Sequence, residues 1–100
     1  PRLIRFQIFQ AFLESLAEQT DLKQNIKYMK PSTVSLSDRF SETSVEIRLE
    51  KITLNQIIRY LYRIEYGGKL TRIKRIHIRP QYTNPNLLDV TLVVYTQELK

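Results

Sequence analysis

The sequence contains no cysteine, and it has only two glycines and one histidine. Without cysteine the chain has no disulfide and no thiolate nucleophile, and it is compatible with a reducing or an oxidising compartment. Gly67 and Gly68 are too few for a glycine-rich phosphate-binding loop. His77 has no second ligand or base partner at a spacing that would indicate a metal or catalytic site. We therefore expect no catalytic residue, no cofactor and no metal, and we predict that the protein is not an enzyme.

Long apolar runs are also missing. No stretch approaches the roughly 18 apolar residues that cross a membrane, and no signal-peptide pattern is present. The apolar share of 42% and the charged share of 26% are typical of one folded domain with a modest core. The chain begins with Pro1 rather than methionine, so we expect a fragment or a processed product. The sequence leaves open whether a membrane anchor lies upstream of the fragment.

The strongest local signal is a helix within Ile52–Gly68. Thr53 and Gln56 have the spacing of a capping box, which satisfies backbone N–H groups at a helix start. We expect Gly67 and Gly68 to end the helix, because glycine adopts the left-handed backbone of a helix C-cap. The apolar residues that recur at helical spacing are Leu54, Ile57, Ile58, Leu61 and Ile64.

A second amphipathic helix is predicted over residues 2–19. Its apolar residues follow a heptad-like seam at Phe6, Phe9, Leu13 and Leu16. Two interpretations stay open: the helix packs on its own sheet, or it continues N-terminally as a dimerising stalk. We accordingly assign residues 1–11 to the end of a coiled-coil-like helix and residues 12–100 to the folded domain.

Four strands are predicted from alternating apolar and polar residues. They lie within residues 22–30, 44–51, 70–79 and 88–95. The first strand should end at Pro31. The third should carry a bulge near Lys74, because Ile73 is out of phase with Ile76 and Ile78.

Residues 31–43 are rich in serine and threonine and are predicted to be a loop. Val34, Leu36 and Phe40 leave open a strand extension or a flap within it.

The predicted order of helix, strand, strand occurs twice, with an approximate internal repeat. This order indicates an α+β fold that is ferredoxin-like in circularly permuted form, with two αββ repeats. Two helices would cover one face of a four-stranded antiparallel or mixed sheet. We expect the second and fourth strands to be central and the first and third to be edges. The Lys and Arg residues of the third strand suit an edge that must resist aggregation.

The net charge of +6 raises the alternative of a nucleic-acid-binding module of the RNA-recognition type. That module stacks bases on exposed aromatics of its central strands. Here Tyr95 is the one aromatic that we expect on the outward side of those strands. We expect Glu46, Glu50 and Asp89 to share this face with Arg75 and Arg79 and to pair with them across strands. The basic residues also divide between a helix and an edge strand, which disfavours nucleic-acid binding.

Three tyrosines on the helix within 52–68 have two interpretations. Either Tyr62 lies at the core boundary while Tyr60 and Tyr66 are solvated, or the tyrosines form a partner-binding surface with Arg59 and Arg63. The second interpretation rests on the enrichment of Tyr and Arg in interface hot spots. The first interpretation is the preferred one.

The second half of the chain resembles the periplasmic domain of PilO proteins of type IV pili and GspM proteins of type II secretion. The resemblance spans residues 12–96. The segments that carry it are Ile52-Thr53-Leu54, Tyr60-Leu61-Tyr62-Arg63-Ile64-Glu65, Ile76-His77-Ile78-Arg79 and Leu88-Asp89-Val90-Thr91-Leu92.

This resemblance implies a bacterial inner-membrane protein with one membrane helix, a periplasmic coiled coil and this periplasmic domain. Such proteins act as scaffolds that form homodimers and pair with a similar sister component, and they have no small-molecule substrate. The related PilN and GspL components share similar folds, so the component within the apparatus stays open. The membrane segment would lie outside this fragment.

Two surfaces are candidates for the protein interface. One is the surface of the central helix together with the N-terminal seam, and the other is the third strand, whose backbone can pair with a neighbouring strand. The candidate interface residues are Phe6, Phe9, Leu13, Tyr60, Arg63, Tyr66, Ile73, Arg75, His77 and Arg79.

Overall fold

The computed structural model describes residues 2–67 and 71–99, with side chains described from Gln7 onward. The helices are α1 (Arg2–Gln19) and α2 (Leu54–Glu65), with a short 3-10 helix η1 (Lys23–Asn25) between α1 and the first strand. The strands are β1 (Ile26–Ser35), β2 (Phe40–Ile52), β3 (Arg72–Pro80) and β4 (Leu88–Leu99).

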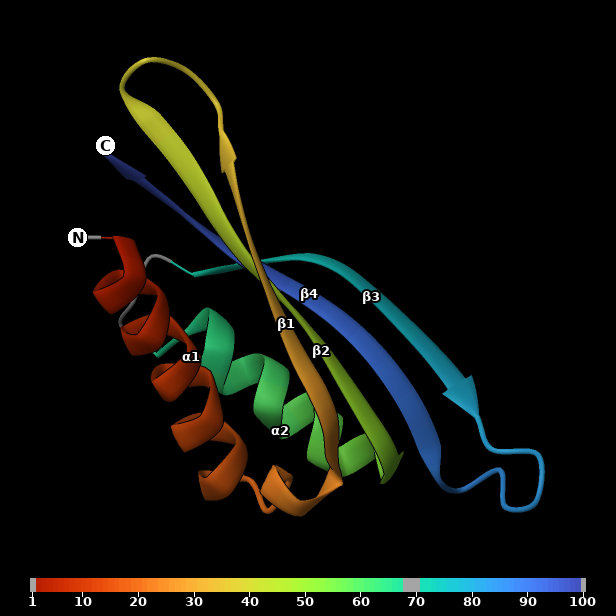
Figure 1. The fold of residues 1–100 in the computed structure, drawn as a ribbon. Coiled ribbons are helices and arrows are strands. Elements are labelled where there is room, and N and C mark those ends of the chain that lie inside the picture. The colour runs from red at the N-terminus through yellow and green to blue at the C-terminus, as the bar shows by residue number, and fades with distance from the viewer. Residues whose placement is uncertain (1, 68–70, 100) are drawn as a thin grey trace.

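The four strands form one antiparallel sheet in the order β1-β2-β4-β3. Both helices lie on one face of this sheet (Figure 1). The predicted α+β fold with two αββ units is therefore confirmed. The predicted positions of the strands are confirmed as well, with β2 and β4 central and β1 and β3 at the edges.

The hydrophobic core lies between the helices and the two central strands. Alternate residues of β2 and β4 face the helices and are buried, since a strand turns successive side chains to opposite faces. The buried residues that form the core are Phe9, Leu13, Leu16, Ala17, Leu22, Val45, Ile47, Leu49, Ile52, Ile57, Tyr60, Ile64, Leu88, Val90, Leu92 and Val94.

Helix α1 packs on the sheet of its own chain through most of the predicted seam. Phe9, Leu13 and Leu16 are buried in the core. For these three residues, the interpretation that the helix packs on its own sheet is therefore the correct one. The side chain of Phe6 lies outside the described residues. The helix runs without a break from Arg2 to Gln19, so the boundary predicted after residue 11 falls inside it.

Helix α2 begins as its sequence predicts. The Thr53 side chain accepts a hydrogen bond from the Gln56 N–H, and the Gln56 side chain accepts one from the Thr53 N–H, which completes the capping box. At the other end, Gly67 does not adopt the predicted left-handed backbone. A Cβ on Gly67 would instead lie 2.5 Å from the Arg63 carbonyl oxygen and 3.1 Å from Cζ of Phe12. Gly67 thus allows a close approach of the chain to α1, and Gly68 lies outside the described residues.

The buried side of α2 differs from the predicted apolar stripe. Ile57 and Ile64 are buried as expected, but Leu54 and Ile58 are 57% and 54% exposed. Tyr60 takes their place in the core with no exposed surface, because it follows Ile57 by three residues and precedes Ile64 by four. The interpretation that placed Tyr62 at the core boundary and Tyr60 in solvent is therefore wrong.

The loop predicted for residues 31–43 is mostly strand. β1 continues through Pro31 to Ser35 and pairs with β2 as far as Ser41, so the alternative of a strand extension is the correct one. Proline is tolerated there because β1 is an edge strand with one neighbour. The result is a long hairpin that projects beyond the helices, together with the end of β4 (Figure 1).

Strand β3 contains the predicted bulge, since its pairing with β4 shifts between Ile73 and Arg75. Ile76 and Ile78 then face the helix side of the sheet, opposite the core residues Leu92 and Val90. They remain 37% and 41% exposed, because an edge strand lacks a second neighbour.

Candidate protein interface

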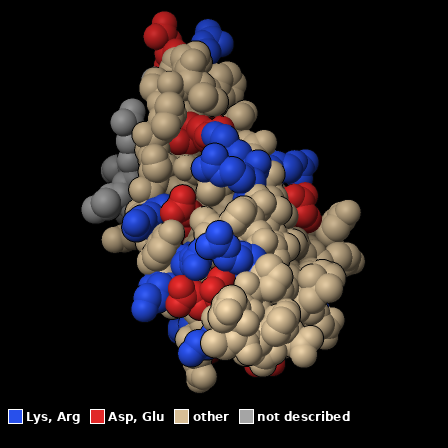
Figure 2. Space-filling model, turned by 90° about the vertical axis from the view of Figure 1, so that its right-hand side faces the viewer, with Lys and Arg blue, Asp and Glu red and all other residues tan. Residues whose placement is uncertain are grey.

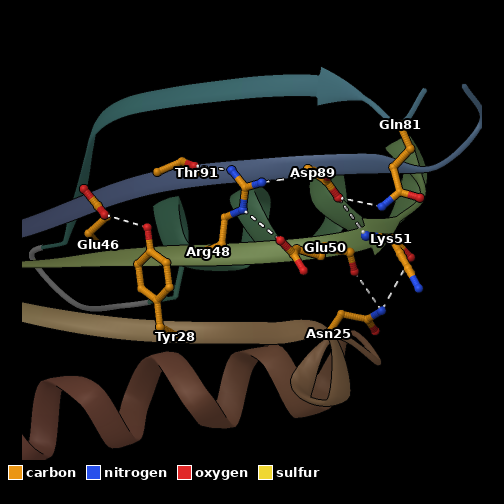
Figure 3. Close-up of polar contacts among 9 residues, drawn as sticks. All are labelled: Asn25, Tyr28, Glu46, Arg48, Glu50, Lys51, Gln81, Asp89 and Thr91. Carbon is orange, nitrogen blue, oxygen red and sulfur yellow. Dashed lines mark hydrogen bonds and ion pairs between the residues drawn. The ribbon is translucent and has the colours of Figure 1, made fainter. Parts of the chain in front are cut away.

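The face of the sheet opposite the helices carries a polar network centred on Arg48 of β2 (Figure 3). Arg48 Nη1 donates to Thr91 Oγ1 of β4 at 3.0 Å, and Arg48 Nε lies 3.4 Å from Glu50 Oε2. Its Nη2 lies 3.8 Å from Asp89 Oδ2. The Arg48 side chain is only 28% exposed, so these contacts are partly shielded from water. They tie the two central strands together.

Asp89 has further partners that hold it in a structural role (Figure 3). Its Oδ1 accepts hydrogen bonds from the Lys51 backbone N–H at 3.2 Å and from Gln81 Nε2 at 3.0 Å. Lys51 has a positive φ of 60°, at the irregularity where the pairing of β2 with β4 shifts. Asn25 Nδ2 donates to the Glu50 carbonyl oxygen at 3.0 Å on the other side of this irregularity. The polar groups therefore hold β2 in place at this irregularity.

Tyr28 and Glu46 form another cross-strand contact on this face. The Tyr28 hydroxyl donates to Glu46 Oε2 at 2.8 Å. This hydrogen bond, followed by burial, raises the pKa of Tyr28 above its ordinary value of 10.0. The contact favours the protonated phenol and leaves Tyr28 as a hydrogen-bond donor within the sheet.

These arrangements do not amount to catalytic geometry in residues 2–67 and 71–99. The carboxylates of the network are engaged with cations or N–H donors of the same sheet. His77 is exposed on β3 opposite Thr91. No group of three His, Cys, Asp or Glu side chains that could hold a metal ion occurs in the described part of the chain.

The ion pairs differ from those predicted. Glu50 and Asp89 pair with Arg48 rather than with Arg75 or Arg79. Arg48 stands on β2, where its guanidinium reaches across to β4, whereas Arg79 is on the edge strand and is exposed. On β3 the bulge residue Lys74 reaches Glu42 Oε2 at 2.7 Å.

The basic residues do not form one continuous surface on the side of the molecule where β3 lies. Figure 2 shows Lys and Arg atoms interspersed with Asp and Glu atoms on this side. Two aromatic residues beyond the predicted Tyr95 belong to the open face, Tyr28 on β1 and Phe40 on β2. Tyr28 is engaged with Glu46, and Lys74 lies 5.8 Å from the centroid of Tyr95. The mixture of charges continues to disfavour nucleic-acid binding on this face.

A groove lies between α1 and α2. Its volume is about 770 Å³. One wall comes from α1 and the other from α2 and the residues just after it. The lining residues are Phe12, Ser15, Leu16, Gln19, Ile58, Arg59, Tyr62, Arg63, Tyr66 and Gly67.

The groove combines aromatic surface with arginine. The rings of Tyr62 and Tyr66 lie 4.8 Å apart at an interplanar angle of 40°, and they are 65% and 74% exposed. Arg63 Nη1 donates to Gln19 Oε1 at 2.8 Å, which links the two walls. Exposed aromatic and arginine side chains are the residue types that dominate protein interfaces.

The structure separates the residues predicted for an interface. Phe9, Leu13 and Tyr60 are buried inside the domain, so their side chains are inaccessible from its surface. Arg63 and Tyr66 line the groove. Ile73 packs partly against the core, while Arg75, His77 and Arg79 are exposed on β3.

Sequence reasoning did not place the apolar residues Phe12 and Ile58 on the surface. Ile58 was assigned to the buried stripe, and Phe12 was not singled out as a surface residue. The four-residue spacing of Leu54, Ile58, Tyr62 and Tyr66 is the signal that could have identified the outer side of α2.

No helix in the described residues is both long and apolar enough to cross a membrane. No family model and no curated protein matches this sequence. The crystal structure of the type 4 fimbrial biogenesis protein PilO from Pseudomonas aeruginosa is similar, with a TM-score of 0.75 and 11% identity over 91% of this chain and 68% of that chain.

The core region of PilO from the type IV pilus system of Pseudomonas aeruginosa is similar with a TM-score of 0.69. Its identity is also 11%, over 84% of this chain and 88% of that chain. At this identity the likeness concerns architecture. The chain therefore has a PilO-like fold.

Proposed function

We propose that this chain is a non-enzymatic assembly domain of the inner-membrane platform of a type IV pilus or type II secretion system. It acts by pairing with a second copy of itself or with a similar domain of a sister component. In this proposal the chain is the periplasmic domain of a bacterial inner-membrane protein, and its membrane segment lies outside these residues.

The observation that carries this proposal is the likeness of the fold to PilO over 91% of the chain. The network around Arg48 supports it indirectly, because its polar groups act on one another across strands instead of converging on a cavity. The two PilO structures concern fimbrial biogenesis and the type IV pilus system. A scaffold in such a system needs surfaces for partners rather than a reaction centre.

Two surfaces remain for this role. Strand β3 has a neighbour on one side only, so the N–H and C=O groups along its free edge can pair with a partner strand, as Ile73, Arg75, His77 and Arg79 were predicted to do. The α1–α2 groove offers Arg63 and Tyr66. From the N-terminal seam, Phe6 stays a candidate.

Sedimentation velocity over a wide concentration series tests the proposal, with a labelled single-stranded oligonucleotide in the same cell. We expect reversible dimers that leave the oligonucleotide behind. Co-sedimentation that persists at about 0.15 M salt would favour the nucleic-acid alternative, because purely electrostatic binding is already weakened there. A strictly monomeric chain that also ignores a similar domain would contradict the scaffold function.

Paired variants locate the surface. Arg75→Ser with Arg79→Ser changes β3, and Arg63→Ser with Tyr66→Ser changes the groove. The pair that weakens association marks the interface, and circular dichroism of each variant checks that the fold is intact.

The absence of cysteine allows a direct test of location. A single cysteine placed at the fully exposed Tyr82 in the intact gene product, with any cysteine outside these residues replaced by serine, should react with a membrane-impermeant maleimide in whole cells. Labelling only after lysis would contradict a periplasmic domain.

A further inference from the structure

An exposed apolar row follows the outer side of α2. Leu54, Ile58, Tyr62 and Tyr66 occur at intervals of four residues, and each is more than half exposed. This spacing forms a ridge of the kind that packs into the grooves of another helix. From Leu54 to Tyr66 the ridge extends roughly 18 Å at the rise of an α-helix. Single exposed apolar residues are ordinary, but a contiguous row of this length marks a binding surface.

The groove beside this row has apolar walls that can contact the side chains of a partner. Phe12 and Leu16 of α1 form the wall opposite Ile58 and Tyr62. At one end, Gly67 lies close to the Phe12 ring. The ridge and groove together offer apolar contact along one side of an incoming helix.

The positive charge of the groove favours an acidic partner. Arg59 and Arg63 are the charged residues among those that line it, and no carboxylate lines it. Arg63 donates one N–H to Gln19, and this bond orients its guanidinium. The other N–H groups of the guanidinium remain as donors for a partner. The side chain of Arg59 has no hydrogen bond or ion pair within the described part of the chain. Two guanidinium groups four residues apart on one helix complement two carboxylates.

We propose that the α1–α2 groove binds an amphipathic helix of a partner protein, with an apolar face and carboxylates about one turn apart that meet Arg59 and Arg63. This assignment rests on the proposed scaffold function and adds the chemistry of the partner to it. A second copy of the chain suits the groove less well. On α1, Glu18 pairs with Lys23 at 3.8 Å and Glu14 accepts a hydrogen bond from Gln10.

Two synthetic helical peptides test this inference. Both have about 18 residues, matched to the length of the ridge, and the same apolar face with one tryptophan. One carries glutamates and the other lysines at the flanking positions. The chain contains no tryptophan, so tryptophan emission, excited at a wavelength that its six tyrosines do not absorb, reports the peptide alone. We expect the glutamate peptide to bind at least about tenfold more tightly than the lysine peptide.

Two sets of variants assign the contacts. Arg59→Gln with Arg63→Gln should weaken the glutamate peptide about tenfold, a loss expected when charge-assisted contacts are removed. Ile58→Ser with Tyr62→Ser should abolish its binding. Arg39→Gln, at an exposed residue between β1 and β2, is the matched control and should leave binding of both peptides unchanged. Equal binding of the two peptides, or binding that ignores both sets of variants, would overturn the proposal.

The outcomes separate this inference from the scaffold function. If the glutamate peptide does not bind while the chain still self-associates, the groove assignment fails and the scaffold function stands. If the groove variants abolish self-association, the occupant is a second copy and the acidic partner is excluded. If the peptide binds but the chain pairs neither with itself nor with a similar domain, the scaffold function fails instead.

Discussion

The hydroxyl of Tyr60 donates a hydrogen bond to the backbone oxygen of Leu13 at 2.9 Å, across 47 residues of sequence. Both side chains have no exposed surface. The bond joins α2 to α1 inside the core, where a phenol without a partner would be costly. This hydrogen bond fixes the position of α2 relative to α1, and these two helices form the walls of the groove.

Replacing Tyr60 with phenylalanine should therefore destabilise the fold modestly. The ring stays in place, and one hydrogen bond worth about 0.5–1.5 kcal/mol is lost. Urea unfolding followed by circular dichroism measures this loss. Tyr66→Phe, at a ring that is 74% exposed, is the control and should leave the midpoint unchanged. An equal loss in both variants would contradict a specific role for the Tyr60 hydroxyl.

Stability should fall in alkaline solution, and Tyr60 is one cause. Burial, and then the charge of Glu14, raise the pKa of Tyr60 well above 10.0 in the folded state. Because the pKa of Tyr60 is higher in the folded than in the unfolded state, its contribution to the free energy of unfolding is fully present below the unfolded pKa near 10. This contribution falls by about 1.4 kcal/mol per pH unit as pH rises from there toward the folded pKa. Urea midpoints between about pH 9 and 11 should fall less steeply in Tyr60→Phe than in the parent. An identical slope would refute this origin.

Removing the guanidinium of Arg48 should weaken the junction of β2 and β4. Arg48→Met keeps much of the side-chain volume but removes the bond to Thr91 and the ion pairs with Glu50 and Asp89. We expect a loss of about 1–3 kcal/mol, because Asp89 and Thr91 lose a partner at a partly buried site. Arg79→Met is the control on the exposed edge strand and should stay within about 0.5 kcal/mol of the parent. Equal effects would show that the network is not structural.

Adding a methyl group at Gly67 should also destabilise the domain. Gly67→Ala would bring Cβ to 2.5 Å from the Arg63 carbonyl oxygen and 3.1 Å from Phe12 Cζ. The backbone has to shift, at a cost of about 1–3 kcal/mol that is typical of overpacking. Thermal unfolding measures the loss. Adding Phe12→Leu to Gly67→Ala should restore only part of the lost stability in a double-mutant cycle, because the close contact with the Arg63 carbonyl oxygen remains. Full recovery would identify the Phe12 ring as the sole obstacle.

Sequence reasoning succeeded where the determinants are local. The spacing of Thr53 and Gln56 predicts the start of α2, and the phase change at Ile73 predicts the bulge in β3. It failed for residues 31–43, since serine and threonine suit loops and also the polar part of a hairpin. The β2 residues of this stretch also pair with the distant end of β4. It likewise placed Tyr60 outside and Ile58 inside the core. The sheet and α1 together decide which side of α2 is covered.

One residue of the hairpin limits how these domains can assemble. Pro31 lies within β1, so the outer edge of that strand lacks one N–H donor, whereas β3 has no proline before Pro80 at its end. A neighbouring strand would therefore miss one hydrogen bond along β1, whereas the feature that interrupts β3 is the bulge between Ile73 and Arg75. If two copies pair through β3, the free edges left are those of β1, each interrupted by Pro31. That arrangement disfavours growth of the sheet from chain to chain and favours closed pairs over fibres.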